Sequence, residues 1–218
     1  MNITGIFRVG GDEILPEFTV VIDGMTGVGK TSLLKIIAAK LNLVPYEEIF
    51  RDENDLLGKF FTAGKEWCFP MQISFLNNRF IQYKEALKLG NVVMDRSIYS
   101  DPIFASFYYK SGDFKPEEYY VYKSLFNNLI ESLKPPSIVI YLSVSAEEAM
   151  RRIKKRGRSD ELQVSDSYWR ALHDEYSKYY KKYRLSPLLT INVDSLDFVN
   201  NLSDQESIVR TVLSTVKQ

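Results

Sequence analysis

The sequence has very little cysteine and histidine, and its charges cancel. Cys68 is the single cysteine and His173 the single histidine among 218 residues. One cysteine excludes an intrachain disulfide and a metal site built on clustered cysteines. One histidine excludes a histidine-rich metal cage and restricts a Ser-His-Asp triad to His173. Because 28 Lys and Arg residues balance 28 Asp and Glu residues, no basic excess favours a nucleic-acid polymer as partner.

Long apolar runs are also absent. No stretch approaches the roughly 20 apolar residues that cross a bilayer, so we expect no membrane partner. Residues 1–17 mix Arg8 with Asp12, Glu13 and Glu17, which matches neither a signal peptide nor a transit peptide. We interpret residues 1–17 as an N-terminal extension and residues 18–218 as a single domain. The expected location is the cytoplasm, or the host cytoplasm if the source is a virus.

Short apolar runs alternate with segments of helical periodicity. Strands are expected at residues 18–23, 43–46, 91–95, 137–142 and 188–193. Helices are expected at residues 31–41, 67–89, 97–109, 117–133, 146–155, 165–183 and 206–217. Strands that are apolar throughout are typical of a parallel sheet covered on both faces. We therefore expect an α/β fold with a five-stranded parallel sheet, and a ligand beyond the carboxyl ends of its strands.

A glycine-rich segment between the first strand and the first helix carries the clearest local motif. Its sequence from Gly24 to Thr31 fits G-x-x-x-x-G-K-[ST], the phosphate loop of P-loop NTPases. Such a loop surrounds phosphate with backbone N–H groups, while Lys30 reaches the β- and γ-phosphates and Thr31 ligates Mg²⁺. The expected ATP contacts here are Gly24, Met25, Thr26, Gly27, Val28, Gly29, Lys30, Thr31 and Ser32. The motif predicts binding of ATP or another nucleoside triphosphate.

An acidic and a basic residue follow the third strand. Asp95 is a candidate Mg²⁺ ligand, and Arg96 a candidate contact for the transferring phosphoryl group. Asp95 could also cap the helix that starts near Ser97, either instead of this role or together with it. The fourth strand is followed by neither a terminal acid nor the N-K-x-D pattern with which GTPases read guanine. The motifs therefore favour a kinase over a GTPase switch.

Residues 151–158 hold six basic side chains in eight positions. A solvated helix end is one interpretation of such a run. In a protein with a phosphate loop, we favour an arginine-rich lid over the triphosphate, at about residues 152–161 with Gly157 as hinge. The lid arginines would be Arg152, Arg156 and Arg158.

In combination these motifs resemble the deoxynucleoside kinases, which comprise the deoxycytidine, deoxyguanosine and deoxyadenosine kinases and mitochondrial thymidine kinase. The resemblance spans residues 19–198. It rests on the phosphate loop, Trp67-Cys-Phe-Pro-Met-Gln72, Arg79, the run from Asp95 to Asp101, and the run from Arg152 to Glu161. It implies transfer of the γ-phosphate of ATP to the 5′-hydroxyl of a deoxyribonucleoside, with Mg²⁺, in nucleotide salvage. It also implies a homodimer formed by helices within residues 97–128.

The resemblance also implies which residues hold the nucleoside. Gln72 would pair with the base edge, and Arg79, seven residues further along the same helix face, would be held by Asp101 and would also face the base. The apolar walls would come from Trp67, Phe75 and Phe104, each of which also suits an ordinary core position. Glu161 matches a contact to the sugar 3′-hydroxyl.

Two positions depart from the family pattern. The general base is a glutamate normally followed by proline, and here Glu48 fits the spacing but the proline is absent. Glu47, Asp52 and Glu53 remain alternatives. Relatives commonly carry a tyrosine that touches the 3′-hydroxyl where this chain has Phe61, so weaker discrimination against ribose is expected.

The C-terminal part offers one further donor contact, because Phe198 falls where the family places its adenine-facing loop. A thymidylate-kinase-like nucleoside monophosphate kinase is the alternative function. It shares the phosphate loop, an Asp-Arg pair after the third strand and an arginine-rich lid. A third possibility is a non-catalytic nucleotide-binding protein, because the proline after Glu48 is missing.

Overall fold

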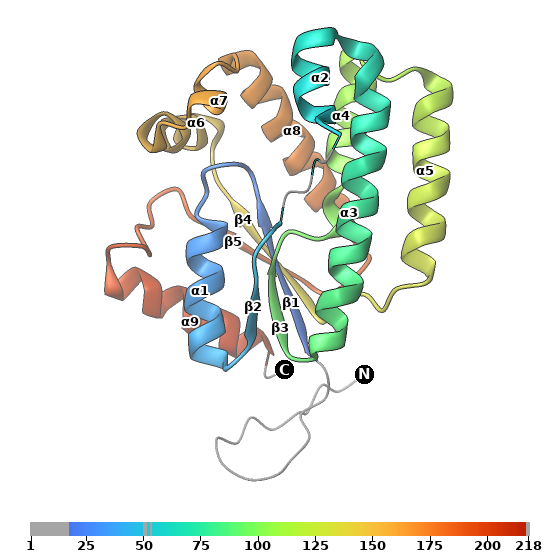
Figure 1. Ribbon diagram of the computed structural model, residues 1–218. Coiled ribbons are helices and arrows are strands. Elements are labelled where there is room, and N and C mark those ends of the chain that lie inside the picture. The colour runs from blue at the N-terminus through green and yellow to red at the C-terminus, as the bar shows by residue number, and fades with distance from the viewer. Residues whose placement is uncertain (1–17, 50–51, 53, 217–218) are drawn as a thin grey trace.

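The computed structural model describes residues 18–49, 52 and 54–216 (Figure 1). The proposed N-terminal extension, residues 1–17, and the candidate base Glu53 lie outside this part. Five parallel strands form one sheet in the order β2-β3-β1-β4-β5. The strands are β1 (Thr19–Gly24), β2 (Val44–Tyr46), β3 (Val92–Asp95), β4 (Ile138–Ser143) and β5 (Leu188–Asn192). The predicted α/β fold with a five-stranded parallel sheet is confirmed.

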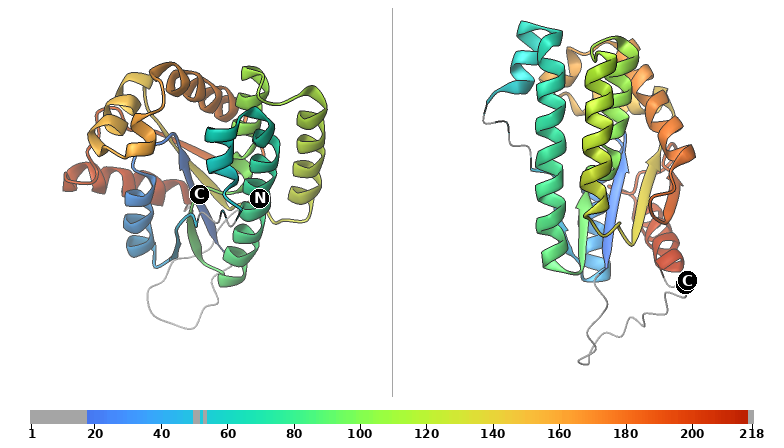
Figure 2. Two further views of the ribbon diagram at one scale, coloured as in Figure 1. Left: turned by 45° about the horizontal axis from the view of Figure 1, so that its top comes forward. Right: turned by 90° about the vertical axis from the view of Figure 1, so that its right-hand side faces the viewer.

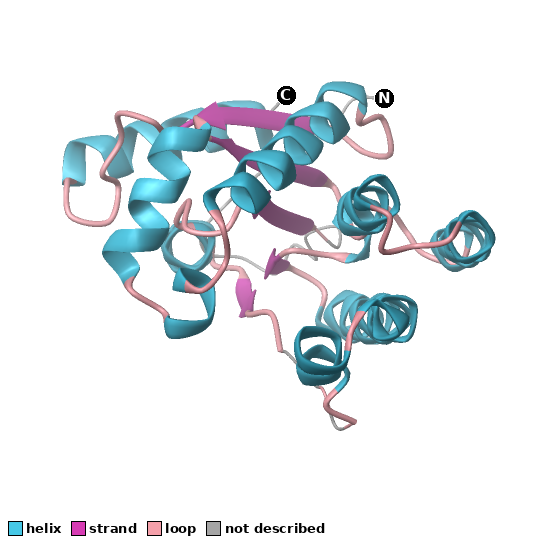
Figure 3. Ribbon diagram, turned by 90° about the horizontal axis from the view of Figure 1, so that it is seen from above, coloured by secondary structure: helices cyan, strands magenta, loops and turns pink. Residues whose placement is uncertain are grey.

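Helices cover both faces of the sheet, which explains why the central strands are apolar throughout (Figure 3). On one face, α1 (Lys30–Leu41) packs against β1, β2 and β3, and α9 (Leu202–Val216) packs against β5. On the other face, α3 (Cys68–Leu89) packs against β3, and α4 (Pro102–Ser111) packs against α8 (Asp166–Lys182). Outside them, α5 (Pro116–Glu131) runs beside α3 (Figure 2).

Three short helices lie above the carboxyl ends of the strands, at the top of Figure 1. They are α2 (Leu56–Ala63), α6 (Ala146–Arg156) and α7 (Ser159–Leu162). Ser145 caps α6 by accepting from the Glu148 N–H, and Gly157 ends it with a φ of 74°, in the left-handed region. This end of the sheet carries the phosphate loop. No helix in the described part of the chain is both long and apolar enough to span a membrane.

The structure departs from the sequence-based expectation in a few elements. The single helix expected at residues 97–109 is instead a 3₁₀ turn, η2 (Ile98–Ser100), followed by α4. Ser97 caps η2 and Pro102 starts α4, because proline lacks the N–H that the interior of a helix needs. The helices α2 and α7 and the 3₁₀ turn η1 (Lys65–Trp67) were not predicted, and α9 begins four residues earlier than predicted.

Candidate active site

The phosphate loop turns the chain sharply between β1 and α1. Gly27 and Gly29 have φ angles of 85° and 97°, which L side chains rarely adopt, so glycine is required at these positions. The Lys30 ammonium donates hydrogen bonds of 3.1 Å to the carbonyl oxygens of Gly24 and Met25. Burial and the charge of Arg96 lower the pKa of Lys30 to about 8. The loop is thus folded with its lysine bent back over it.

Thr31 and Asp95, the two candidate magnesium ligands, lie side by side. The Thr31 hydroxyl donates a hydrogen bond of 2.6 Å to Asp95 Oδ2. The other carboxylate oxygen, Oδ1, is buried and finds no hydrogen-bond partner among the described residues. The helix-cap alternative for Asp95 is wrong, because Ser97 supplies the cap of η2. A hydroxyl and a carboxylate with a free oxygen form a donor set that suits a hard cation such as Mg²⁺.

Glu48 lies between two buried arginines from different elements. One carboxylate oxygen accepts a hydrogen bond of 2.7 Å from Arg79 of α3, and the other lies 3.8 Å from Nε of Arg96, which follows β3. Burial raises the pKa of Glu48, but the charges of Arg79 and Arg96 and the hydrogen bond from Arg79 outweigh burial and lower the pKa to about 2. Glu48 is therefore ionised at neutral pH.

The other candidate bases point elsewhere or have their oxygens occupied. Glu47 is exposed and forms an ion pair of 3.2 Å with Lys35. The Asp52 carboxylate caps α2 by accepting from the N–H groups of Leu56 and Leu57 at 2.7 and 2.8 Å. Among the described candidates, only Glu48 faces the arginines beside the phosphate loop.

The expected nucleoside residues Gln72, Arg79 and Asp101 are all buried. Arg79 NH1 is hydrogen-bonded to Asp101, so the predicted pair is present. The Arg79 guanidinium lies over the Phe75 ring at 5.5 Å, and that of Arg96 lies over the Phe104 ring at 5.4 Å. The two arginines are thus fixed by both carboxylates and aromatic rings.

Other expected residues lie away from this cluster. Trp67 is in η1, with the Lys59 ammonium over its ring at 4.9 Å. Phe61 is 66% exposed on α2. Glu161 in α7 forms ion pairs with Arg156 at 2.6 Å and with Arg158 at 3.7 Å. Both lid arginines therefore contact the acid that was expected to bind the sugar.

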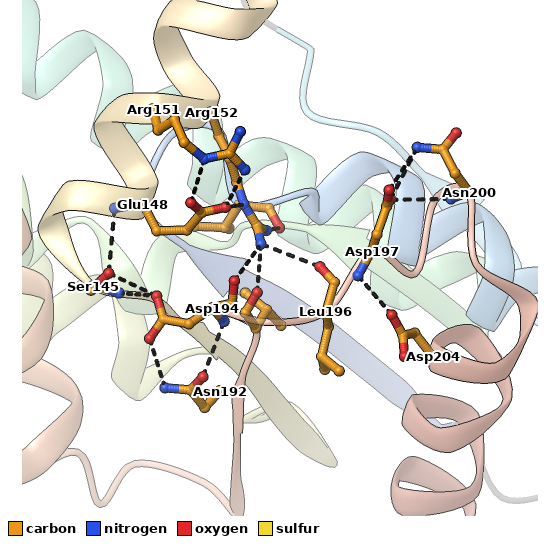
Figure 4. A network of polar contacts seen from close by, with 12 residues as sticks. Ser145, Glu148, Arg151, Arg152, Asn192, Asp194, Leu196, Asp197, Asn200 and Asp204 are labelled. Atoms are coloured by element: carbon orange, nitrogen blue, oxygen red, sulfur yellow. Dashed lines mark hydrogen bonds and ion pairs between the residues drawn. The ribbon is translucent and has the colours of Figure 1, made fainter.

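Arg152 and Phe198 occupy environments that the motifs did not indicate. Arg152 bonds to Glu148 and to carbonyl oxygens of the loop between β5 and α9 (Figure 4). Phe198 is only 1% exposed, with its ring directly against Gly29. The expectation of an aromatic surface open to a donor base therefore does not match the position of Phe198.

Sequence reasoning also missed several residues of the site. The Gln82 side chain donates a hydrogen bond of 2.5 Å to the carbonyl oxygen of Ile49 and accepts one of 3.4 Å from its N–H, which holds the backbone next to Glu48. Asp23, fully buried before the loop, accepts from the Gly24 N–H at 2.6 Å. Tyr176 of α8 lies 6.0 Å from the Arg96 guanidinium. Of these residues, only Asp23 could have been found from the sequence, because it directly precedes the phosphate-loop motif that begins at Gly24.

The fold and this site together define a phosphotransferase of the P-loop class, with a buried acidic and basic cluster beside the phosphate loop. The sequence profile described as deoxynucleoside kinase matches residues 20–217. The chain belongs to the deoxynucleoside kinase family and is a deoxynucleoside kinase, an enzyme that phosphorylates deoxynucleosides. The thymidylate-kinase-like alternative is not favoured.

Individual relatives agree with this family membership. A deoxyguanosine kinase of Lactobacillus johnsonii is 34% identical, over 91% of this chain and 92% of the relative. A deoxyadenosine/deoxycytidine kinase of Bacillus subtilis is also 34% identical, over 93% and 95%. A solved structure of deoxyadenosine kinase from M. mycoides with bound dATP superposes with a TM-score of 0.76 at 32% identity, covering 89% of this chain and 99% of that one.

Proposed function

We propose that this kinase transfers the γ-phosphate of ATP to the 5′-hydroxyl of a deoxynucleoside, with Glu48 accepting the hydroxyl proton. The observation that carries this assignment is the position of the Glu48 carboxylate between Arg79 and Arg96. An ionised carboxylate in contact with a nucleoside-side arginine and a phosphate-side arginine lies where a hydroxyl must lose its proton.

The reaction needs positioning and charge neutralisation more than covalent chemistry. A bond forms between the 5′-oxygen and the γ-phosphorus, the bond between that phosphorus and the β,γ-bridging oxygen breaks, and ADP leaves. The proton moves to Glu48, which is ionised before the reaction because its pKa is lowered to about 2. Lys30 and Arg96 neutralise the charge on the phosphoryl oxygens.

Thr31 and Asp95 would hold Mg²⁺, because the buried Asp95 Oδ1 is unpartnered among the described residues and the Thr31 hydroxyl is adjacent. When bound, the cation neutralises and orients the β- and γ-phosphates. The backbone from Gly24 to Ser32 would surround those phosphates, and Lys30 would leave its carbonyl partners to reach them.

The nucleoside would lie between Glu48 and the buried face of α3. Gln72, Arg79 and Asp101 would read the base edge, and Phe75 and Phe104 would form the walls. We also propose a sugar contact for Glu161 and wall positions for Phe61 and Trp67, which lie on the helices above the sheet.

We propose that residues 18–218 form one kinase domain and that Arg156 and Arg158 close over the triphosphate as part of a lid. Both arginines now pair with Glu161, and the left-handed Gly157 separates them from one another. Closure would exchange these ion pairs for bidentate contacts to phosphate and free Glu161 for the sugar.

A homodimer through α4 and α5 is a further part of the proposal. Tyr120 is 76% exposed on α5, and Tyr109 of α4 stacks on Tyr119 with ring centroids 4.4 Å apart. Exposed aromatic side chains of this kind are typical of interface centres. Sedimentation equilibrium should give twice the mass of the chain for the wild type. If this face forms the dimer, Tyr120→Glu should give the mass of one chain.

The test of the proposed function is a phosphorylation panel with ATP, Mg²⁺ and deoxyadenosine, deoxyguanosine, deoxycytidine or thymidine. The relatives are named for the first three nucleosides. Phosphate on at least one nucleoside supports the proposal. Phosphate on dTMP but on no nucleoside would instead indicate a nucleoside monophosphate kinase. Such an enzyme needs unpaired cationic side chains to bind the acceptor phosphate. In this structure Arg79 pairs with Glu48 and Asp101, and Arg96 pairs with Glu48. No transfer to any acceptor would indicate a non-catalytic protein.

A further inference from the structure

The phosphate loop is packed between two other parts of the chain. A Cβ atom added at Gly27 would lie 3.1 Å from Cγ1 of Ile153, so α6 packs closely against this glycine. A Cβ atom added at Gly29 would lie 2.7 Å from Cζ of Phe198, so the ring covers this glycine from the loop after β5. One support comes from α6 and the other from the segment between β5 and α9.

Arg152 ties these two supports together. Its Nε donates to Glu148 at 2.6 Å within α6, and one terminal nitrogen donates to the carbonyl oxygens of Val193 at 2.5 Å and Leu196 at 3.2 Å (Figure 4). The other terminal nitrogen reaches the carbonyl oxygen of Val28 in the phosphate loop at 3.5 Å. The guanidinium thus joins α6, the segment before Phe198 and the loop itself.

The segment that Arg152 holds is braced independently at the start of α6. Asp194 Oδ1 accepts from the N–H and the hydroxyl of Ser145 at 2.7 and 2.8 Å, and the Asn192 amide donates to Oδ2 at 3.1 Å (Figure 4). The carbonyl groups that Arg152 binds are therefore fixed on both sides, and Phe198 follows them in sequence. A fixed segment can hold the ring of Phe198 against Gly29.

We propose that Arg152 and Phe198 are positioning residues of the phosphate loop, which act on ATP through Val28 and Gly29 and not by contact with the donor base. All three guanidinium nitrogens of Arg152 donate to oxygen atoms of the protein, and the Phe198 ring is buried. The inference rests on the proposed ATP site. It places Arg152 in the fixed support and leaves Arg156 and Arg158, on either side of Gly157, to close as the lid.

Inorganic tripolyphosphate separates the two roles, because it fills the phosphate loop but has no base. Calorimetric titration of ATP and of tripolyphosphate, at one Mg²⁺ concentration, is performed on wild type, Arg152→Gln and Phe198→Leu. Charge-assisted hydrogen bonds contribute about 1.5–3 kcal/mol, so Arg152→Gln should weaken both ligands about tenfold or more, by the same factor. Phe198→Leu should weaken both about tenfold, while KM for the nucleoside stays at the wild-type value.

Two matched controls accompany these variants. Arg151 also pairs with Glu148, at 2.6 Å, and both of its hydrogen bonds go to that residue. Arg151→Gln should therefore bind both ligands normally. Val199 follows Phe198 and is exposed, so Val199→Ala should also be normal. Thermal unfolding shows which variants are folded. If Arg152→Gln is unfolded, Arg152→Lys and Phe198→Leu carry the test, with a smaller and parallel loss expected for the lysine.

Weaker ATP binding with unchanged tripolyphosphate binding would overturn the inference and assign these residues to the donor base. Unchanged binding of both ligands would overturn it as well. A wild-type protein that binds no ATP and phosphorylates no nucleoside would instead contradict the proposed function. The two failures are therefore distinguishable.

Discussion

The Glu48 carboxylate accepts a hydrogen bond of 2.7 Å from Arg79, which is itself bonded to Asp101. This contact connects the proposed base to the residues that would read the nucleobase, because Arg79 lies on the same face of α3 as Gln72. A nucleoside that contacts Arg79 therefore lies beside the carboxylate that would take its proton. Recognition of the substrate and alignment of its hydroxyl depend on the same arginine.

The pH dependence of kcat/KM should show no ionisation of Glu48 between pH 4.5 and 7, because its pKa is lowered to about 2. Arg79→Gln removes a positive charge and a hydrogen bond from the carboxylate, while burial still favours the neutral form. The acid limb of the variant should therefore move to higher pH, and Arg79→Lys, which keeps the charge, should move it less. Comparison at equal ATP concentration cancels the titration of ATP itself. Identical acid limbs in wild type and Arg79→Gln would contradict this electrostatic account.

The stability of the protein should follow the same linkage. The folded-state pKa of Glu48 lies below its ordinary value of 4.5, so its ion pairs stabilise the native state above about pH 4.5. That contribution is lost as the pH falls toward 2. Wild type should therefore lose more stability than Glu48→Gln between pH 5 and pH 3 in denaturant titrations.

Gln82 should support catalysis through the backbone next to Glu48. Gln82→Leu removes two hydrogen bonds to Ile49, each worth about 0.5–1.5 kcal/mol, so kcat should fall about tenfold. The dissociation constant of the nucleoside should change less, because Arg79 and Gln72 remain. Lys88→Gln, on an exposed position of the same helix, is the control. Equal losses in kcat and in nucleoside affinity would indicate a general distortion of α3 in place of this positioning role.

Thr31 and Asp95 should determine the requirement for Mg²⁺. Thr31→Val removes the hydroxyl that bonds to Asp95 and should raise the Mg²⁺ concentration for half-maximal activity about ten- to a hundredfold. Thr31→Ser keeps the hydroxyl and should stay near wild type. A magnesium titration at fixed ATP measures both variants. An unchanged half-maximal concentration in Thr31→Val would remove this residue from the metal site.

Phe61 should weaken the discrimination between deoxyribose and ribose, because its ring cannot hydrogen-bond to the sugar. The measurement is the ratio of kcat/KM for deoxyadenosine and adenosine, and for thymidine and uridine. Phe61→Tyr restores a hydroxyl on an exposed position of α2 and should raise the ratio about two- to tenfold, the value of one neutral hydrogen bond. A strong preference of the wild type for deoxyribose would refute the expectation.

The sheet and the phosphate loop were predictable because they leave local signals. Buried parallel strands are apolar throughout, and a glycine motif between a strand and a helix has few other uses. The helix α2 was missed because its 8 residues are fewer than the roughly 11–18 in which helical periodicity can be recognised, although Leu56, Leu57 and Phe60 pack against the core. The interruption between η2 and α4 depends on Ser97 and Pro102, whose effects were outweighed by the apolar residues around them.

The parts of the site that depend on tertiary contacts were harder to foresee. The motif placed Arg152 in the lid, yet nothing local shows that its guanidinium binds carbonyl groups more than forty residues away. Gln82 also gave no signal, because its partner Ile49 is thirty-three residues distant. Arg96 takes a left-handed φ of 62°, which is rare without glycine and places its N–H on the Ile22 carbonyl at 2.9 Å.

The central claim, that Glu48 takes the proton of the nucleoside hydroxyl, is tested most directly by single-turnover phosphoryl transfer in Glu48→Gln. Removal of a general base costs about 10²–10⁴-fold, so transfer should fall by that factor while the nucleoside still binds. Glu47→Gln, which alters the exposed neighbour, should transfer at the wild-type rate. Near-normal transfer in Glu48→Gln would contradict the account.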